Sequence, residues 1–160
     1  MKKIRLSQNK FALIDDEDFE ELNKHEWYVC KDRKFLYAVR DVRSGIKRIL
    51  VRMHREIMKP PENMQIDHIN HNGLDNRKSN LRVCTNSQNQ YNQKIRKNLT
   101  SGCKGVSWKK QTKRWMAHIG INRTKKHLGY YSSEKEAAIA YNNAAKELFG
   151  DFALLNVVGQ

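Results

Sequence analysis

The sequence has little of what builds membrane, secreted or disulfide-linked proteins. Its 160 residues contain no apolar run of about 18 or more, the length that crosses a bilayer. Residues 1–5 lead into polar residues and not into an apolar signal stretch, so we expect a cytoplasmic protein without a membrane partner. The three cysteines, Cys30, Cys84 and Cys103, lie far apart and include no Cys-x-x-Cys pair. They predict neither a disulfide framework nor a zinc ribbon, but plain small apolar side chains.

Acidic residues are also scarce relative to basic ones. The chain carries 31 Lys and Arg against 17 Asp and Glu, a net charge of +14. Residues 1–58, 59–97 and 98–160 each contain more basic than acidic residues. A positive charge spread in this way suits a polyanion contacted over some distance, because each neutralised phosphate releases counterions. The charge therefore favours a nucleic-acid partner over a basic protein with no particular partner.

The first third of the chain predicts short strands with small helices. Apolar runs bounded by turn residues predict strands at 11–14, 27–30, 35–39 and 46–51. Helices are expected from Asp15 to about Lys24 and over 53–58, where Pro60 and Pro61 stop the second one. The acids of residues 15–18 could form a metal site, but a helix start, which favours carboxylates, explains them better.

Residues 64–95 have a different composition, dense in His and Asn. We expect a strand at 64–69, a polar loop at 70–80, a strand at 81–84 and a helix from Thr85 to about Ile95. Hydrolysis of a phosphodiester needs an activated water and a cation near the charged oxygens. A neutral imidazole can accept the proton of the water. Carboxylate and amide oxygens are hard ligands suited to Mg²⁺ or Mn²⁺.

Four blocks of this stretch resemble, in order and spacing, the HNH endonucleases, in particular the phage and intron-associated homing enzymes. The blocks are Ile66-Asp67-His68-Ile69-Asn70, Asp75-Asn76-Arg77, Asn80-Leu81-Arg82 and Asn86-x-x-Asn89-x-x-Asn92. The resemblance covers about residues 52–94. It implies a ββα-metal nuclease motif that acts on double-stranded DNA in a bacterial or phage-infected cell.

The resemblance also implies a role for each matching residue. His68 would be the general base, and Asp67 and Asn89 would bind one divalent cation, Mg²⁺ or Mn²⁺. Asn80 would hold the loop by hydrogen bonds to the backbone. From the residues alone, Asn86 and Asn92 compete with Asn89 for the ligand role. Three further polar residues are expected to be non-catalytic: His54 would pack or contact phosphate, and His71 and Asn76 would stabilise their own turn.

Beyond a polar stretch at 94–102, which we interpret as a linker, the sequence predicts three strands and one helix. The strands are expected at 104–108, 114–122 and 125–130. Ser133 and Glu136 form a capping box for a helix that ends at Gly150 and carries an alanine-rich apolar stripe.

This segment resembles the ethylene-response-factor type of DNA-binding domain. The matching blocks are Lys104-Gly105-Val106, Trp115-x-Ala117-x-Ile119, His127-Leu128-Gly129-Tyr130-Tyr131, Ala137-Ala138-x-Ala140-Tyr141-x-x-Ala144-Ala145 and Ala153-x-Leu155-Asn156. The resemblance implies a sheet that lies in the major groove, with the helix on its other face. Strand alternation and the adjoining rim predict a DNA-binding set of Ser107, Lys109, Lys110, Lys113, Arg114, His118, Lys125 and His127.

The sequence therefore predicts an α+β protein with two domains, an HNH nuclease domain at 1–98 and an ethylene-response-factor-like domain at 102–160. We expect a metal-dependent DNA endonuclease of the homing type that acts as a monomer on double-stranded DNA. The alternative is a DNA-binding regulator that does not cleave. An RNA-binding protein is disfavoured, because the aromatic residues alternate into cores and form no exposed stacking platform.

Overall fold

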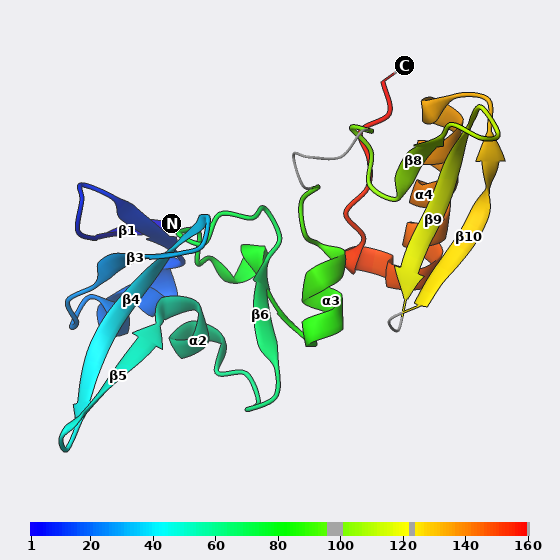
Figure 1. Cartoon of the computed structure of the whole chain (residues 1–160). Helices are drawn as coiled ribbons and strands as arrows, with labels where there is room; N and C mark the ends of the chain where they lie inside the picture. Colours follow the sequence, from blue (N-terminus) through cyan, green and yellow to red (C-terminus); the bar gives the residue numbers. More distant parts are fainter. Residues whose placement is uncertain (96–100, 122–123, 160) are drawn as a thin grey trace. The chain divides into compact units, whose positions relative to one another are not determined.

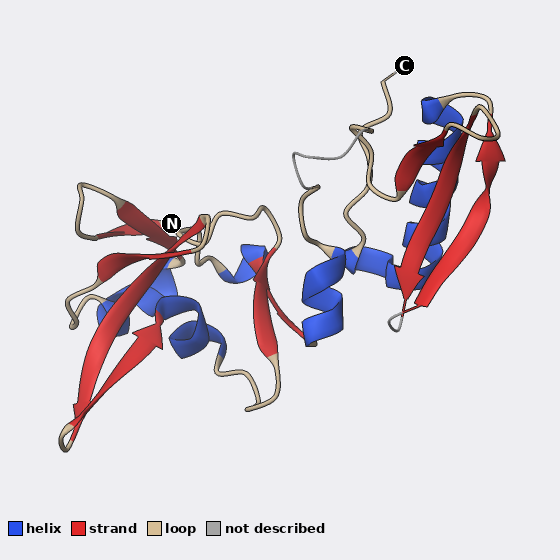
Figure 2. Ribbon diagram, in the orientation of Figure 1, coloured by secondary structure: helices blue, strands red, loops and turns tan. Residues whose placement is uncertain are grey.

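The computed structural model describes residues 1–95, 101–121 and 124–159. The fold contains helices and small antiparallel sheets, which confirms the predicted α+β class (Figure 2). The chain folds into two compact units, residues 1–86 and 87–160. None of the helices in the described residues is long and apolar enough to cross a membrane.

The first unit contains three antiparallel sheets and short helices (Figure 1). The strands are β1 Lys2–Arg5, β2 Phe11–Ile14, β3 Tyr28–Asp32, β4 Phe35–Ser44, β5 Lys47–Arg52, β6 Gln65–His68 and β7 Leu81–Cys84. The helices are η1 Asp16–Asp18, α1 Phe19–Leu22, α2 Met53–Met58 and η2 Lys78–Asn80, of which η1 and η2 are 3-10 turns. The sheets pair β1 with β2, β3 with β4 and β5, and β6 with β7.

The core of the first unit follows from strand alternation. In β2, Phe11 is exposed whereas Ala12 and Ile14 are fully buried, so every second side chain enters the core. Trp27 packs in the same cluster, and its indole N–H donates to the carbonyl of Leu22 at 2.8 Å. This bond ends the first helical stretch at Leu22, short of the predicted Lys24. The sequence did not predict β1.

The acidic stretch before α1 serves the fold. The Asp15 carboxylate accepts from the backbone N–H of Lys78 at 2.7 Å. The Lys78 ammonium also lies 2.5 Å from Glu17 and 3.2 Å from Asp18. These contacts attach the acidic turn to the segment that precedes β7, so the carboxylates have a role in the fold besides the expected one at the helix start.

The second unit contains one three-stranded sheet, with the strand order β10-β9-β8, and one long helix. Its elements are α3 Asn86–Tyr91 (which begins at the last residue of the first unit), β8 Val106–Lys109, β9 Arg114–Ile121, β10 Thr124–Tyr131, α4 Glu134–Phe149 and the 3-10 turn η3 Gly150–Phe152. Ala137, Ala138 and Ala145 are fully buried against the sheet. Their small size allows the helix to lie close to the strands.

The structure supports the expected cap of α4 and corrects the length of α3. The Ser133 side chain accepts from the N–H of Glu136 at 3.1 Å, and the Glu136 carboxylate accepts from the N–H of Ser133, so the predicted capping box is confirmed. The helix predicted to run to Ile95 ends at Tyr91. Of the predicted linker, residues 96–100 lie outside the described residues, as do residues 122–123 at the predicted end of the second strand.

Tertiary contacts explain the early end of α3. The ring of Tyr91 stacks on Phe149, with centroids 3.7 Å apart and planes within 9°. The Lys104 ammonium donates to the carbonyl oxygens of Tyr91, at 2.5 Å, and Gln93, at 3.1 Å. A cation at these carbonyls satisfies groups that a helix end leaves without an intrahelical partner. A prediction from local sequence could not foresee contacts with residues so far along the chain.

Candidate active site

The hairpin of β6 and β7 carries the predicted catalytic pair. Its register places Asp67 opposite Arg82, and His68 opposite Leu81. Asp67 and His68 are both buried, with exposed fractions of 6% and 7%. Consecutive residues of a strand point to opposite faces, so the two side chains have different neighbours.

The neighbour of Asp67 is an arginine. Arg82 Nε and Nη2 both donate to Asp67 Oδ2, at 2.9 Å and 2.6 Å. The Arg82 side chain is only 16% exposed, so this ion pair is largely shielded from water. A shielded pair of this kind, joined by two hydrogen bonds, fixes the position of the carboxylate.

The imidazole of His68 lies among other rings. His54, from α2, meets it edge to face with the ring centroids 5.0 Å apart, and Tyr37, from β4, lies 6.0 Å away. His68 Nε2 also lies 3.4 Å from Asn76 Oδ1. Burial lowers the pKa of His68, although the bond to Asn76 and the charge of Asp67 oppose this. The imidazole is therefore neutral near pH 7, the form that can accept a proton.

Asn80 joins the two ends of the loop between the strands. Its Nδ2 donates to the carbonyl of Asp75 at 2.8 Å, and its Oδ1 accepts from the N–H of Asn70 at 3.0 Å. Its own carbonyl accepts from the N–H of Ile69 at 2.9 Å. Asn80 is 6% exposed, so these bonds satisfy polar groups that would be costly to leave unpaired.

Asp75 and Asn76 are buried in the middle of the same loop. Asp75 is 1% exposed and accepts two hydrogen bonds of 2.7 Å from Arg77, whose guanidinium lowers the pKa of the carboxyl. The N–H of Asn76 donates to Leu13 at 2.8 Å, which anchors the loop to β2. Gly73 packs where a Cβ would lie 2.3 Å from the carbonyl oxygen of Leu36 and 2.8 Å from the ring of Tyr37. The loop is therefore packed against strand β2 of one sheet and strand β4 of another. Tyr37 of β4 lies against both the loop and the ring of His68.

The donor chemistry of this site fits a hard divalent cation held by few protein groups. Within the part of the chain that the structure describes, no three His, Cys, Asp or Glu side chains form a metal cluster. Mg²⁺ keeps most of its waters and commonly takes only one or two protein carboxylates. The Asp67 carboxylate suits that role. The Nδ2 of Asn76 is buried without a hydrogen-bond partner in the described structure, so a polar atom close to His68 is left unpaired by the described residues.

The three helix asparagines differ in their surroundings. Asn86 starts α3, Asn89 lies within it, and Asn92 follows its end. Asn92 is 5% exposed. Asn86 is the last residue of the first unit, whereas Asn89 and Asn92 belong to the second. The choice of Asn89 as a ligand stays a prediction.

The second unit gathers most of the predicted DNA-binding side chains on one sheet face. The register pairs Lys109 with Arg114, His118 with His127, and Lys125 with Gly120, and paired residues share a face. Ser107 shares this face through its pairing with Met116. Trp115 and Ala117 point the opposite way, into the core against α4. Lys110 and Lys113 lie in the turn between β8 and β9.

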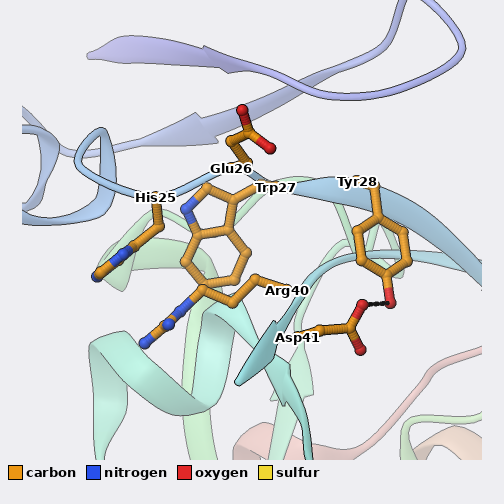
Figure 3. Close-up of a pocket in the computed structure, with 6 residues that line it drawn as sticks. All are labelled: His25, Glu26, Trp27, Tyr28, Arg40 and Asp41. Atoms are coloured by element: carbon orange, nitrogen blue, oxygen red, sulfur yellow. Dashed lines mark hydrogen bonds between the residues drawn. The ribbon is translucent and has the colours of Figure 1, made fainter. Parts of the chain in front are cut away.

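A polar pocket lies on another part of the first unit (Figure 3). Its lining residues are His25, Glu26, Trp27, Tyr28, Arg40 and Asp41. The Tyr28 hydroxyl donates to Asp41 at 2.9 Å, and the Arg40 guanidinium lies over the Trp27 ring, 5.6 Å from its centroid. Arg40 also donates twice to Glu56 of α2. These contacts explain the pocket as a structural junction between β4, β3 and α2.

Comparison with known proteins points to one family. A family model described as HNH endonuclease matches residues 59–91, which include the whole of β6, the loop and β7. The mimivirus protein "Uncharacterized HNH endonuclease L560" (Acanthamoeba polyphaga mimivirus) is 32% identical over 154 residues, 92% of this chain and 75% of its own. Protein 3.8 of Escherichia phage T7 is 34% identical over 94 residues, 58% of this chain and 76% of its own. No solved structure shows a significant match.

Proposed function

The chain belongs to the HNH endonuclease family, and we propose that it is a metal-dependent enzyme that hydrolyses phosphodiester bonds of double-stranded DNA, with His68 as its general base. The observation that carries this proposal is the buried imidazole of His68, whose pKa is lowered by burial, next in sequence to Asp67 on one hairpin. A base of this kind must lose its proton before it can take one from water, and burial, which lowers the pKa of His68, favours that deprotonated form.

Asp67 is the proposed protein ligand of the cation in the first unit, and Asn89 is the second ligand that the sequence predicts. Both offer hard oxygens, the donor type of Mg²⁺ and Mn²⁺. When bound, the cation would supply positive charge for the leaving oxygen. The ion pair with Arg82 fixes the position of the Asp67 carboxylate.

The remaining polar residues are proposed to position the base. Asn80 fixes both ends of the loop, while Asn76 Oδ1 faces His68 Nε2. The tautomer with its proton on Nε2 donates to this oxygen, which leaves Nδ1 as the nitrogen that can accept a proton, whereas the opposite tautomer would set two acceptors against each other. The hydrogen bond to Asn76 therefore favours one tautomer and restricts the rotation of the ring.

The second unit is proposed to grip DNA through its sheet face. The support is the shared face of Lys109, His118, Lys125 and His127, with α4 packed on the other side. The likeness to ethylene-response-factor domains rests on sequence motifs together with this arrangement of three strands and one helix. We keep 1–98 and 102–160 as the proposed limits of the nuclease and DNA-binding domains.

A homing role is proposed from the sequence resemblance, with relatives in a phage and in a giant virus as context. We propose that the enzyme acts as a monomer on DNA in a bacterial or phage-infected cell. The contacts that position it would be mainly with phosphates, because its excess charge is spread along the chain.

Metal-dependent cleavage tests the proposal. Supercoiled plasmid incubated with the full chain and Mg²⁺ should be nicked or linearised, and EDTA should abolish the reaction. Asp67→Asn keeps the shape of the side chain and removes its charge, so it should raise the Mg²⁺ concentration needed for half-maximal rate. Tight DNA binding without cleavage, in Mg²⁺ and in Mn²⁺, would instead identify a non-cleaving regulator.

A further inference from the structure

The outer half of the β4–β5 hairpin is a two-stranded ribbon that pairs with no third strand of the described residues. β3 pairs only with residues 35–39 of β4, whereas β4 continues to Ser44 and pairs with β5 as far as Lys47. We call residues 40–52 the basic arm. Figure 1 shows it as the cyan ribbon that extends away from the rest of its unit. All side chains from residue 43 to residue 50 are exposed.

The basic arm is strongly positive. It contains five basic residues and one acid: Arg40, Arg43, Lys47, Arg48, Arg52 and Asp41. The two basic residues at its base are used by the fold, since Arg40 pairs with Glu56 and Arg52 with Asp32. Arg48 pairs with Asp41. Arg43 and Lys47 form no ion pair with any residue of the described ranges, so the end of the arm carries two uncompensated cations.

The register adds an unfavourable contact. Arg43 lies directly opposite Arg48, and side chains that are paired in this way share a face of the ribbon. Like charges directly opposite each other destabilise a pair of strands. An anion placed between them would turn this repulsion into two favourable contacts, as a phosphate does with arginine.

The tip of the basic arm is apolar, which is unusual for an exposed turn. Gly45, with φ at +61°, and Ile46 form the two-residue turn, and the Ile46 side chain is fully exposed. Ile49 and Leu50 are also nearly half exposed. A two-stranded ribbon with water on both faces is marginally stable, so apolar side chains here favour a partner over solvent.

We propose that the basic arm enters the major groove of duplex DNA. The major groove admits a two-stranded ribbon, and phosphates border it on both sides. Arg43 and Lys47 would contact those phosphates, while Ile46 would contact base edges such as the thymine methyl group. The inference rests on the proposed function in that it takes DNA as the partner, and it assigns the first unit a grip of its own, additional to the sheet face of the second.

The salt dependence of DNA binding tests the phosphate contacts. Binding of the full chain to a fluorescent mixed-sequence duplex would be measured without divalent metal at several KCl concentrations. Arg43→Gln/Lys47→Gln should lower the slope of log Kd against log salt by about 1.8, since each lost phosphate contact removes about 0.9. The matched control is Lys3→Gln/Arg5→Gln, which removes the same charge from the exposed residues of β1 in the same unit. It should leave the slope unchanged.

The apolar tip has a different expected effect. Ile46→Ser should weaken binding roughly five-fold, the size of one lost apolar contact, with no change of slope. Thermal unfolding should show that the Arg43→Gln/Lys47→Gln variant is no less stable than the wild type, because the substitutions relieve the repulsion with Arg48. The inference would be overturned if the wild type and Arg43→Gln/Lys47→Gln had the same slope of log Kd against log salt. It would also be overturned if the control Lys3→Gln/Arg5→Gln lowered this slope by as much as Arg43→Gln/Lys47→Gln does.

Cleavage assays in parallel separate this inference from the proposed function. If the basic-arm substitutions lower the salt slope of DNA binding but the wild type cuts no DNA, the nuclease proposal fails and the inference about the basic arm holds. If it cuts DNA and the slope does not depend on the arm, the arm inference fails and the nuclease proposal stands. Loss of self-association in the arm variant, with an unchanged slope, would make the basic arm a protein interface and would also overturn the inference.

Discussion

His54 and His68 meet edge to face, with ring centroids 5.0 Å apart and planes at 81°. One ring comes from α2 and the other from β6, and both side chains are buried. Burial lowers the pKa of His54 to about 3, helped by the neighbouring His68, Arg52 and Arg55. His54 therefore contributes a neutral wall to the proposed base, and a charge on it would disturb the site.

The burial of His54 makes the free energy of unfolding depend on pH. The folded pKa of His54 lies below the ordinary value of about 6.5, so in acid the unfolded chain takes up a proton that the folded chain does not. The free energy of unfolding should fall as the pH drops from about 6.5 towards 3, by at most about 1.4 kcal/mol per pH unit from this residue. His54→Leu should show a shallower fall, measured by urea unfolding between pH 7 and pH 5. Equal slopes for the two proteins would contradict this account.

Asn80 should matter more for stability than its exposed neighbours do. Asn80→Ala removes two hydrogen bonds to loop backbone and leaves buried groups unsatisfied, so it should cost about 2–3 kcal/mol of unfolding free energy. Denaturant titration would measure this cost.

Asn72 offers a matched control in the same loop. It is exposed, and its side chain accepts a backbone hydrogen bond from Leu74. Asn72→Ala should therefore cost less than about 1 kcal/mol. An equal loss of unfolding free energy in Asn80→Ala and Asn72→Ala would contradict the proposed role of Asn80 in holding the loop.

The sheet face of the second unit should bind phosphates. Lys109→Gln/Lys125→Gln should lower the salt slope of DNA binding by about 1.8, as for any two phosphate contacts. Lys135→Gln/Lys146→Gln removes the same charge from the exposed side of α4 and should leave the slope unchanged. Equal slopes for these two variants would place the DNA elsewhere on the molecule.

Much of the fold is local and could be predicted. The strand at Phe11–Ile14, the helix at Met53–Met58 and the hairpin around Asp67 follow from apolar alternation and turn residues. The capping box at Ser133 is a short-range signal of the same kind. By contrast, β1 has one buried apolar side chain, Ile4, among exposed charged residues, and only pairing with β2 makes it a strand.

The surroundings of His68 could be predicted only in part. The sequence motif brought attention to Asp67, His68 and Asn80, which share one hairpin and its loop. It could not show that Tyr37 and His54 surround the imidazole, because both come from elements outside the motif's central blocks. Nor could it show the ion pair of Asp67 with Arg82, which depends on strand register. The sequence held only a weak indication that His54 is buried, namely its place in the first turn of the short helix α2, directly after strand β5.

The most direct test of the account is the rate at which His68→Ala cleaves DNA in Mg²⁺, compared with the wild type at equal DNA occupancy. Loss of the general base should slow cleavage by about 10² to 10⁴-fold, while DNA affinity and its salt slope stay as in the wild type. His25→Ala, a change at a partly exposed histidine of the same unit, should cut at the wild-type rate. A folded His68→Ala protein that cuts as fast as the wild type would contradict the assignment of His68 as the base.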